Sequence, residues 1–259
     1  NGETLAELQA DPRYEPFLEQ AEALLNAKDR IPYGSIRGQH IYNFWRDAEH
    51  VRGIVRRTSL ESYRTAKSEW ETVLDVDALA KSENENWVYK GIAWLAPGYE
   101  RCLVELSRGG TDASVHREFD TLAKRFVEGG FVLPEAKSDV TWLDRDTLLV
   151  GTNWGDGSLT KSGYPRISKR WKRGTPLAKA ATIFEGREED ISISPRVMDS
   201  GEATLPMITQ SLTFYTGAYL LIGDDGKLLR LPLPESVDLA GFFAGRILFT
   251  LRDAWEVAG

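Results

Sequence analysis

Short aromatic strand patches recur along this chain about every fifty residues. They occupy residues 41–45, 92–95, 140–143, 191–193 and 239–243. The intervals from Trp94 to Trp142, from Trp142 to Ser192 and from Ser192 to Ala240 measure 48, 50 and 48 residues. A fixed period of this size is typical of repeat architectures, and about 40–50 residues is the length of one four-stranded propeller blade. The chain is therefore predicted to be a row of similar β-modules.

The first thirty residues follow a helical pattern instead. Apolar side chains between residues 3 and 28 recur at three- and four-residue spacings, as they do in amphipathic helices. Asp11-Pro12 interrupts this pattern. Because proline fits the first turn of a helix but not its interior, two short helices are expected rather than one long helix. We therefore place a helical N-terminal segment at residues 1–30 and the β-propeller blades at residues 31–259.

From residue 38 onward the pattern is that of strands. The first repeat offers strands at 40–46, 51–58 and 71–75, followed by a helical turn at 75–80. The second offers 87–95, 101–107, 114–120 and a weaker strand at 125–127; the third offers 138–143, 147–153, 164–171 and 180–184. The fourth offers 190–198, 207–215, 218–222 and 227–231, with Asp224-Asp225-Gly226 as a hairpin signal between the last two. A fifth repeat begins with 239–243 and 246–251.

These repeats predict a mainly β fold: a partial β-propeller of about four to five four-stranded blades. Four blades and the start of a fifth do not complete a ring, and propellers avoid exposed sheet edges by closing. A fragment, an assembly completed by a partner and a smaller closed ring are all compatible with this count. The chain begins with Asn1-Gly2 rather than Met, so we expect processing or excision from something longer. Dimerisation through blade edges, or swapped strands, is expected to cover the open edges.

Composition disfavours several functional classes. The net charge of −7 argues against nucleic acid or an anionic membrane as a partner, and no apolar stretch reaches the roughly 18 residues that span a bilayer. The single cysteine, Cys102, excludes an intrachain disulfide and is interpreted as a buried thiol. The three histidines lack metal-ligand spacing, so we expect neither a metal nor another cofactor. One cysteine suits the cytoplasm, with the periplasm after signal-peptide removal as the alternative.

The chain carries no recognisable catalytic motif. G-x-S-x-G does not occur; residues 34–38 (GSIRG) have the serine one place too early and are interpreted as a turn. No Walker loop occurs, and the glycine-rich stretch 151–157 is interpreted as a connection between strands. The basic run 169–173 and the acidic run 188–190 are interpreted as solvated strand ends or turns, and Trp94 and Trp142 as packing between blades rather than carbohydrate platforms. We therefore assign no catalytic, cofactor-binding or metal-ligating residue.

Several stretches, taken in order, resemble the prolyl oligopeptidase family of serine peptidases. They include GQHIYNFWRD at 38–47 and DVTWLDRDTLLV at 139–150, with 70–80, 106–113, 163–166, 169–175, 231–234 and 251–255. The resemblance covers nearly the whole chain and implies the N-terminal β-propeller portion of such a peptidase. In that family a seven-bladed propeller caps an α/β-hydrolase catalytic domain of the same polypeptide. Its catalytic serine, aspartate and histidine follow the propeller, and no position here matches them.

The resemblance implies that the propeller restricts access, so that short peptides, including proline-containing ones, reach a buried catalytic triad and folded proteins do not. On this hypothesis residues 1–259 alone are inactive, and the specificity pocket lies outside them. The alternative is a stand-alone binding module that a partner or a second copy completes. A propeller enzyme with a metal site on its axis, such as a lactonase, is disfavoured because histidine is scarce.

Overall fold

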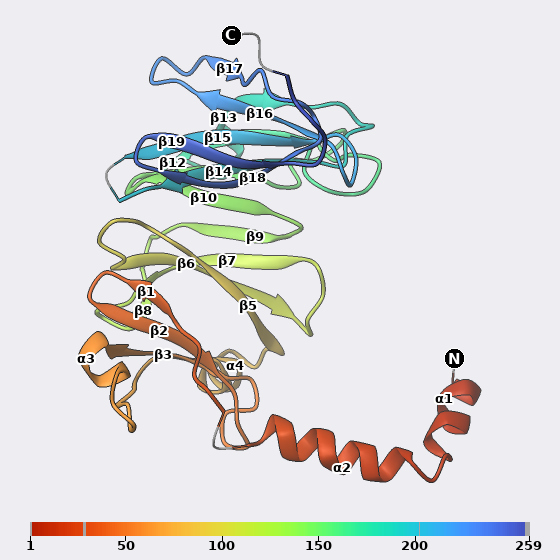
Figure 1. Cartoon of the computed structure of the whole chain (residues 1–259). Coiled ribbons are helices and arrows are strands. Elements are labelled where there is room, and N and C mark those ends of the chain that lie inside the picture. Colours follow the sequence, from red (N-terminus) through yellow and green to blue (C-terminus); the bar gives the residue numbers. More distant parts are fainter. Residues whose placement is uncertain (1, 28–29, 202, 257–259) are drawn as a thin grey trace. The chain divides into compact units, whose positions relative to one another are not determined.

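The computed structural model describes residues 2–27, 30–201 and 203–256, and the chain divides into two compact units, 1–87 and 88–259 (Figure 1). Both units consist chiefly of small antiparallel sheets whose strand order follows the order in the chain. This is the mainly β, blade-by-blade architecture that the fifty-residue period predicts.

Two helices open the first unit, α1 (Gly2–Gln9) and α2 (Tyr14–Leu25). Between them the Asp11 carboxylate accepts the Arg13 backbone N–H at 2.9 Å and pairs with the Arg13 guanidinium, which fixes the turn. The predicted break at Asp11-Pro12 is therefore confirmed. Both helices leave apolar side chains exposed, namely Leu5, Leu8, Phe17, Leu24 and Leu25.

The first blade contains β1 (Ser35–Arg37), β2 (His40–Trp45), β3 (Ile54–Ser59) and β4 (Glu71–Asp75). The strands at 40–46, 51–58 and 71–75 were predicted, but β1 was not. The interpretation of residues 34–38 as a turn is wrong for 35–37, since Ile36 pairs with Ile41 in an antiparallel ladder, whereas Gly38 lies in the turn before β2. The patch 41–45 consequently lies in the second strand of its blade.

Two short helices connect the strands of this unit. Helix α3 (Leu60–Tyr63) follows β3, and the Ser59 hydroxyl caps it by accepting the Ser62 N–H at 3.1 Å. Helix α4 (Val76–Glu83) occupies the predicted helical turn at 75–80, where the Asp75 carboxylate accepts the Ala78 N–H at 2.9 Å. It ends at Asn84, which adopts the left-handed conformation with φ of 50°.

The second unit contains three blades and a further hairpin. The second blade has β5 (Trp87–Trp94), β6 (Arg101–Arg108), β7 (Ser114–Asp120), β8 (Arg125–Phe126) and β9 (Val132–Ala136). The third has β10 (Asp139–Asp144), β11 (Thr147–Gly151), β12 (Ile167–Lys172) and β13 (Ala181–Glu185), with the short helix η1 (Leu177–Lys179) before β13. The fourth has β14 (Ser192–Asp199), β15 (Thr204–Ser211), β16 (Gly217–Ile222) and β17 (Leu228–Arg230), and the hairpin has β18 (Val237–Phe243) and β19 (Arg246–Leu251).

The outer position of the second blade is shared between two strands. β8, the weak strand predicted at 125–127, pairs with the end of β7 through Phe119 and Phe126. β9 pairs with the beginning of β7, where His116 lies opposite Leu133. The sequence did not predict β9, which contains Pro134, a residue that cannot donate a ladder hydrogen bond.

Aromatic side chains form the core between the second and third blades. Phe131 packs edge-on against Trp142 and Trp171, with ring centres 5.7 and 4.9 Å apart. The Trp142 indole N–H donates to the Ala93 carbonyl at 3.0 Å, which joins β10 to β5. The predicted packing role of Trp142 is confirmed. Trp94 is only half-buried and lies edge-on to Tyr99, and Cys102 is buried as predicted.

Two charged runs are less solvated than their sequences predict. In 169–173 the Trp171 ring is buried and Arg173 pairs with Glu118, whose side chain is 2% exposed. In 188–190 the glutamates are exposed, but Asp190 is buried and its carboxylate accepts from the Gln210 amide at 2.8 Å. Glu118 is neutralised by a partner 55 residues away, whereas Asp190 is satisfied both by Gln210 and by the nearby Arg187, whose backbone N–H and guanidinium bind its carboxylate.

Candidate functional site

The main polar cluster of the second unit lies where β6 and β7 pair. Glu105 stands opposite His116 in the ladder, so both side chains share a face of the sheet. The Ser114 hydroxyl donates to Glu105 Oε1 at 2.8 Å, while His116 Nε2 lies 3.9 Å from Glu105 Oε2. His116 is buried, and its Nδ1 has no hydrogen-bond partner among the described residues.

A second polar pair joins the third and fourth blades. The Ser194 hydroxyl of β14 donates to Asp139 Oδ2 of β10 at 2.8 Å. These are the first strands of successive blades, and blades arranged around an axis approach each other most closely at their inner strands. Burial raises the pKa of Asp139, against the lowering effects of the Ser194 hydrogen bond and of Arg196; the Glu105 charge raises it further. Because the Glu105 charge acts on Asp139, the two clusters are treated together as the polar region of the second unit.

The arrangement of this region is unsuited to nucleophilic catalysis. A serine nucleophile needs a base, usually histidine, within hydrogen-bonding reach of its hydroxyl. Here the Ser114 hydroxyl is directed to the Glu105 carboxylate, and Ser194 donates to Asp139. Burial lowers the pKa of His116 and so favours the neutral imidazole, while the Glu105 charge opposes this lowering. The cluster is a polar wall on the blades rather than a triad.

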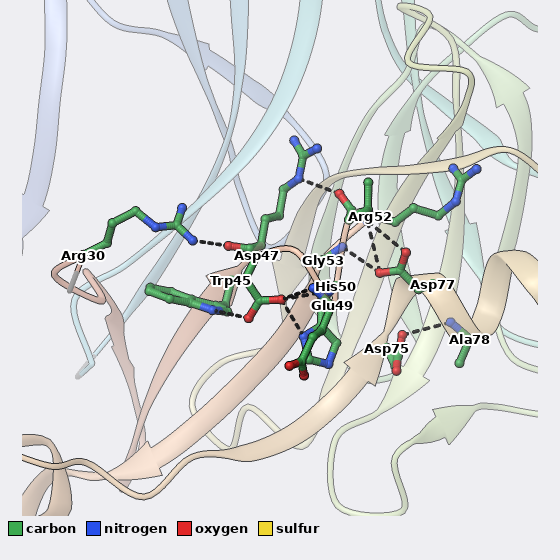
Figure 2. A network of polar contacts seen from close by, with 12 residues as sticks. Arg30, Trp45, Asp47, Glu49, His50, Arg52, Gly53, Asp75, Asp77 and Ala78 are labelled. Atoms are coloured by element: carbon green, nitrogen blue, oxygen red, sulfur yellow. Dashed lines mark hydrogen bonds and ion pairs between the residues drawn. The ribbon is translucent and has the colours of Figure 1, made fainter. Parts of the chain in front are cut away.

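The polar network of the first unit fixes the connection between β2 and β3 (Figure 2). The Asp47 carboxylate accepts from the Trp45 indole at 2.9 Å and from the His50 backbone N–H at 2.8 Å. Burial raises the pKa of Asp47, but hydrogen bonds from His50, Trp45 and Glu49 outweigh it and lower the pKa to about 2. The Asp77 carboxylate accepts the backbone N–H groups of Arg52 and Gly53 in the same way.

The other sequences considered for chemistry have local structural roles. The predicted hairpin at Asp224-Asp225-Gly226 is confirmed: Gly226 has φ of 78°, and the Asp225 carboxylate accepts the Lys227 N–H at 3.0 Å. Residues 152–157 belong to the connection between β11 and β12, in which the Ser158 hydroxyl accepts the Trp154 N–H. Within residues 2–27, 30–201 and 203–256, no group of three or more His, Cys, Asp or Glu side chains could hold a metal ion.

Sequence reasoning missed the polar region because its contacts depend on strand register and blade adjacency. Glu105 and His116 are 11 residues apart, and they meet only because a hairpin of known register pairs them. Asp139 and Ser194 are 55 residues apart. Asp139 and Ser194 both lie near aromatic patches of the fifty-residue repeat, and one repeat of separation is the only signal that could have brought them together.

Comparison with known proteins agrees with this architecture. Residues 6–208 match the family described as prolyl oligopeptidase, N-terminal beta-propeller domain. The chain belongs to the prolyl oligopeptidase family. Its residues correspond to the propeller portion of these peptidases, as the resemblance of the sequence motifs implies.

Two relatives of this prolyl oligopeptidase propeller are longer peptidases. An uncharacterized peptidase of Sinorhizobium fredii is 40% identical over 268 residues, which is 100% of this chain and 36% of the relative. An uncharacterized peptidase of Rickettsia prowazekii is 31% identical over 262 residues, covering 96% of this chain and 36% of the relative. The chain therefore spans about a third of the length of the curated relatives it matches.

Solved structures show the same blade arrangement. A post-proline cleaving enzyme from Rickettsia typhi superposes with a TM-score of 0.89 at 30% identity, over 98% of this chain and 39% of that enzyme. Oligopeptidase B from Leishmania major superposes with a TM-score of 0.62 at 12% identity, over 90% of this chain and 35% of that one, which is a likeness of fold alone. In the described part of the chain, no helix is both long and apolar enough to span a membrane.

Proposed function

We propose that this propeller controls substrate access in a prolyl-oligopeptidase-like serine peptidase that hydrolyses short peptides, including proline-containing ones. The observation that supports it is the family match over residues 6–208 together with relatives named as peptidases that are almost three times longer. The solved relative from Rickettsia typhi is named as a post-proline cleaving enzyme. A catalytic α/β-hydrolase domain of the same polypeptide is the partner this proposal requires.

The proposed catalytic step uses a serine outside residues 1–259. The Ser114 and Ser194 hydroxyls of the polar region donate to carboxylates, so they lack the base that acyl transfer needs. We therefore expect the chain alone to be inactive. Purified residues 1–259 and the full-length polypeptide are compared on a chromogenic peptide with proline before the scissile bond, and both are treated with a fluorophosphonate probe. Turnover and labelling only in the full-length protein support the proposal, whereas turnover by 1–259 contradicts it.

Gating is tested separately with a length series. Peptides that share one cleavable sequence are extended from about five to fifty residues, and a folded protein with that sequence in a surface loop is the last member. A propeller that restricts access makes the full-length enzyme cleave the short peptides and leave the folded substrate intact. Equal rates across the series would show that these blades do not select by size.

Location is part of the same proposal. A cytoplasmic enzyme suits a domain whose one thiol, Cys102, is buried and unpaired. Fractionation of cells that express the tagged full-length protein tests this, with a periplasmic pool as the contrary result.

A further inference from the structure

The first unit holds a cavity of about 470 Å³ lined by arginine and aromatic side chains. The guanidinium carbon of Arg56 lies 4.1 Å from the centre of the Trp45 ring and 4.4 Å from that of Trp70. The guanidinium of Arg30 lies 4.4 Å from the Trp45 ring centre. Tyr63 meets Trp70 edge-on at 6.1 Å. Two cations and three aromatic rings therefore line one cavity.

The hydrogen bonds of these two arginines go to neutral acceptors. Arg56 Nε donates to the Asn43 side-chain oxygen at 2.9 Å. Arg30 Nε donates to the Ala27 carbonyl at 2.9 Å, and its Nη2 donates to the Arg46 carbonyl. Among the described residues, neither guanidinium forms an ion pair with a carboxylate.

The charge balance of the cavity is correspondingly cationic. Burial lowers the pKa of Arg56 to about 10, with Asp47 raising it and Arg30 lowering it. Asp47 is already bound to Trp45 and to the His50 turn, as Figure 2 shows. Two neighbouring arginines that repel each other are stabilised by an added anion.

We propose that this cavity binds a carboxylate carried on a peptide. The planar guanidinium of Arg56 offers paired N–H donors that match the two oxygens of a carboxylate, and the Trp45 and Trp70 rings suit the apolar part of the same ligand. Thr65 and Ser68 also line the cavity. The inference depends on the first unit alone and stands whether or not the parent protein is a peptidase.

The site is tested on the whole chain by calorimetry and tryptophan fluorescence. The probes are N-acetyl-Ala-Pro-Phe with a free carboxylate, the same peptide as its amide, and an amidated version that carries one glutamate. We expect the free acid to bind at least tenfold more tightly than the plain amide, and the affinity to fall as salt increases. If the glutamate peptide binds as well, the site accepts both C-terminal and side-chain carboxylates. If the glutamate peptide does not bind, the site is specific for the C-terminal carboxylate of a peptide.

Variants connect the binding to the named residues. Arg56→Gln and Arg30→Gln should each weaken the free acid at least tenfold, and Arg56→Lys should recover only part of the loss because it keeps the charge without the planar donor pair. Arg64→Gln is the control, since Arg64 is exposed beside the cavity and does not line it. Arg30→Gln leaves the blade strands untouched, so it remains informative if Arg56→Gln impairs folding.

Several results would overturn the inference. They are equal affinity for the acid and its amide, unchanged affinity in a folded Arg30→Gln protein, and inorganic phosphate binding as tightly as the acid, which would indicate a general anion site. Arg64→Gln weakening the acid as much as Arg56→Gln would also contradict it, because the effect would then be one of net charge.

Discussion

Replacing Arg173 by methionine should loosen the junction between the second and third blades. Arg173 Nη1 and Nη2 donate to the two oxygens of Glu118 at 2.8 and 3.1 Å, and Nε donates to Asp146 at 2.7 Å. The Glu118 side chain is 2% exposed and the Arg173 side chain 29%. Removing one partner of a buried ion pair leaves an uncompensated charge, at a cost of about 3–5 kcal/mol. Because Arg173 is partly exposed and Glu118 keeps the Phe131 N–H, we take the lower end, about 3 kcal/mol.

Hydrogen exchange at the Phe131 amide measures this local effect directly. That N–H donates to Glu118 Oε2 at 2.9 Å, so it exchanges when the junction opens. A loss of about 3 kcal/mol corresponds to roughly a hundredfold faster exchange. Arg145→Met removes an exposed cation from the neighbouring turn and is the matched control. Adding Glu118→Gln to Arg173→Met should restore part of the protection, since it removes the unpaired charge. Exchange in Arg173→Met within threefold of the control would refute the reasoning.

Three further outcomes are expected. In urea unfolding, Gly53→Ala should destabilise the protein by about 1–3 kcal/mol more than Gly110→Ala. Both glycines have positive φ, but a Cβ added at Gly53 would lie 2.4 Å from the Phe44 ring, whereas a Cβ added at Gly110 would have its nearest neighbour 3.9 Å away. Asp139→Asn should raise the melting temperature at pH 7. The pKa of Asp139 is raised in the folded chain, so ionisation of this carboxyl lowers the stability of the fold as pH rises through about 4 and above. The gain from Asp139→Asn should therefore vanish at pH 3, and an equal gain at pH 3 would contradict the raised pKa. Asp77→Ala should cost about 1–3 kcal/mol, because two backbone N–H groups lose their acceptor, and Asp77→Asn should cost less.

The sequence predicts the elements whose apolar periodicity is long, and it misses those that depend on pairing. The break between α1 and α2, the strands β5, β6 and β10, and the hairpin before β17 all follow from spacing and turn chemistry. β1 is three residues long between Gly34 and Gly38, so it offers too little alternation to distinguish a strand from a turn. It becomes a strand because β2 provides the complementary ladder.

Polar sites are predicted less well than strands for the same reason. A buried carboxylate is tolerated only where partners satisfy it. Here Arg173 reaches Glu118 from another blade, and Gln210 reaches Asp190 from another strand in addition to its local partner Arg187. Glu118 and Arg173 are 55 residues apart, and Asp190 is bound by Gln210 from the neighbouring strand. Composition and local motifs carry no information on such pairs. The absence of a local motif is thus compatible with an extensive polar network.

The aromatic repeat explains why one blade carries a cavity of a different kind. In the third blade the repeat patch is the first strand, and Trp142 is buried against the Phe131 ring. In the first blade β1 precedes the patch, so the patch becomes the second strand. Trp45 is half-buried, and the guanidiniums of Arg30 and Arg56 lie over its ring. A tryptophan of the repeat therefore stabilises a blade junction where the patch is the first strand, as Trp142 does. Where the patch is the second strand, Trp45 lines the proposed ligand site with Arg30 and Arg56.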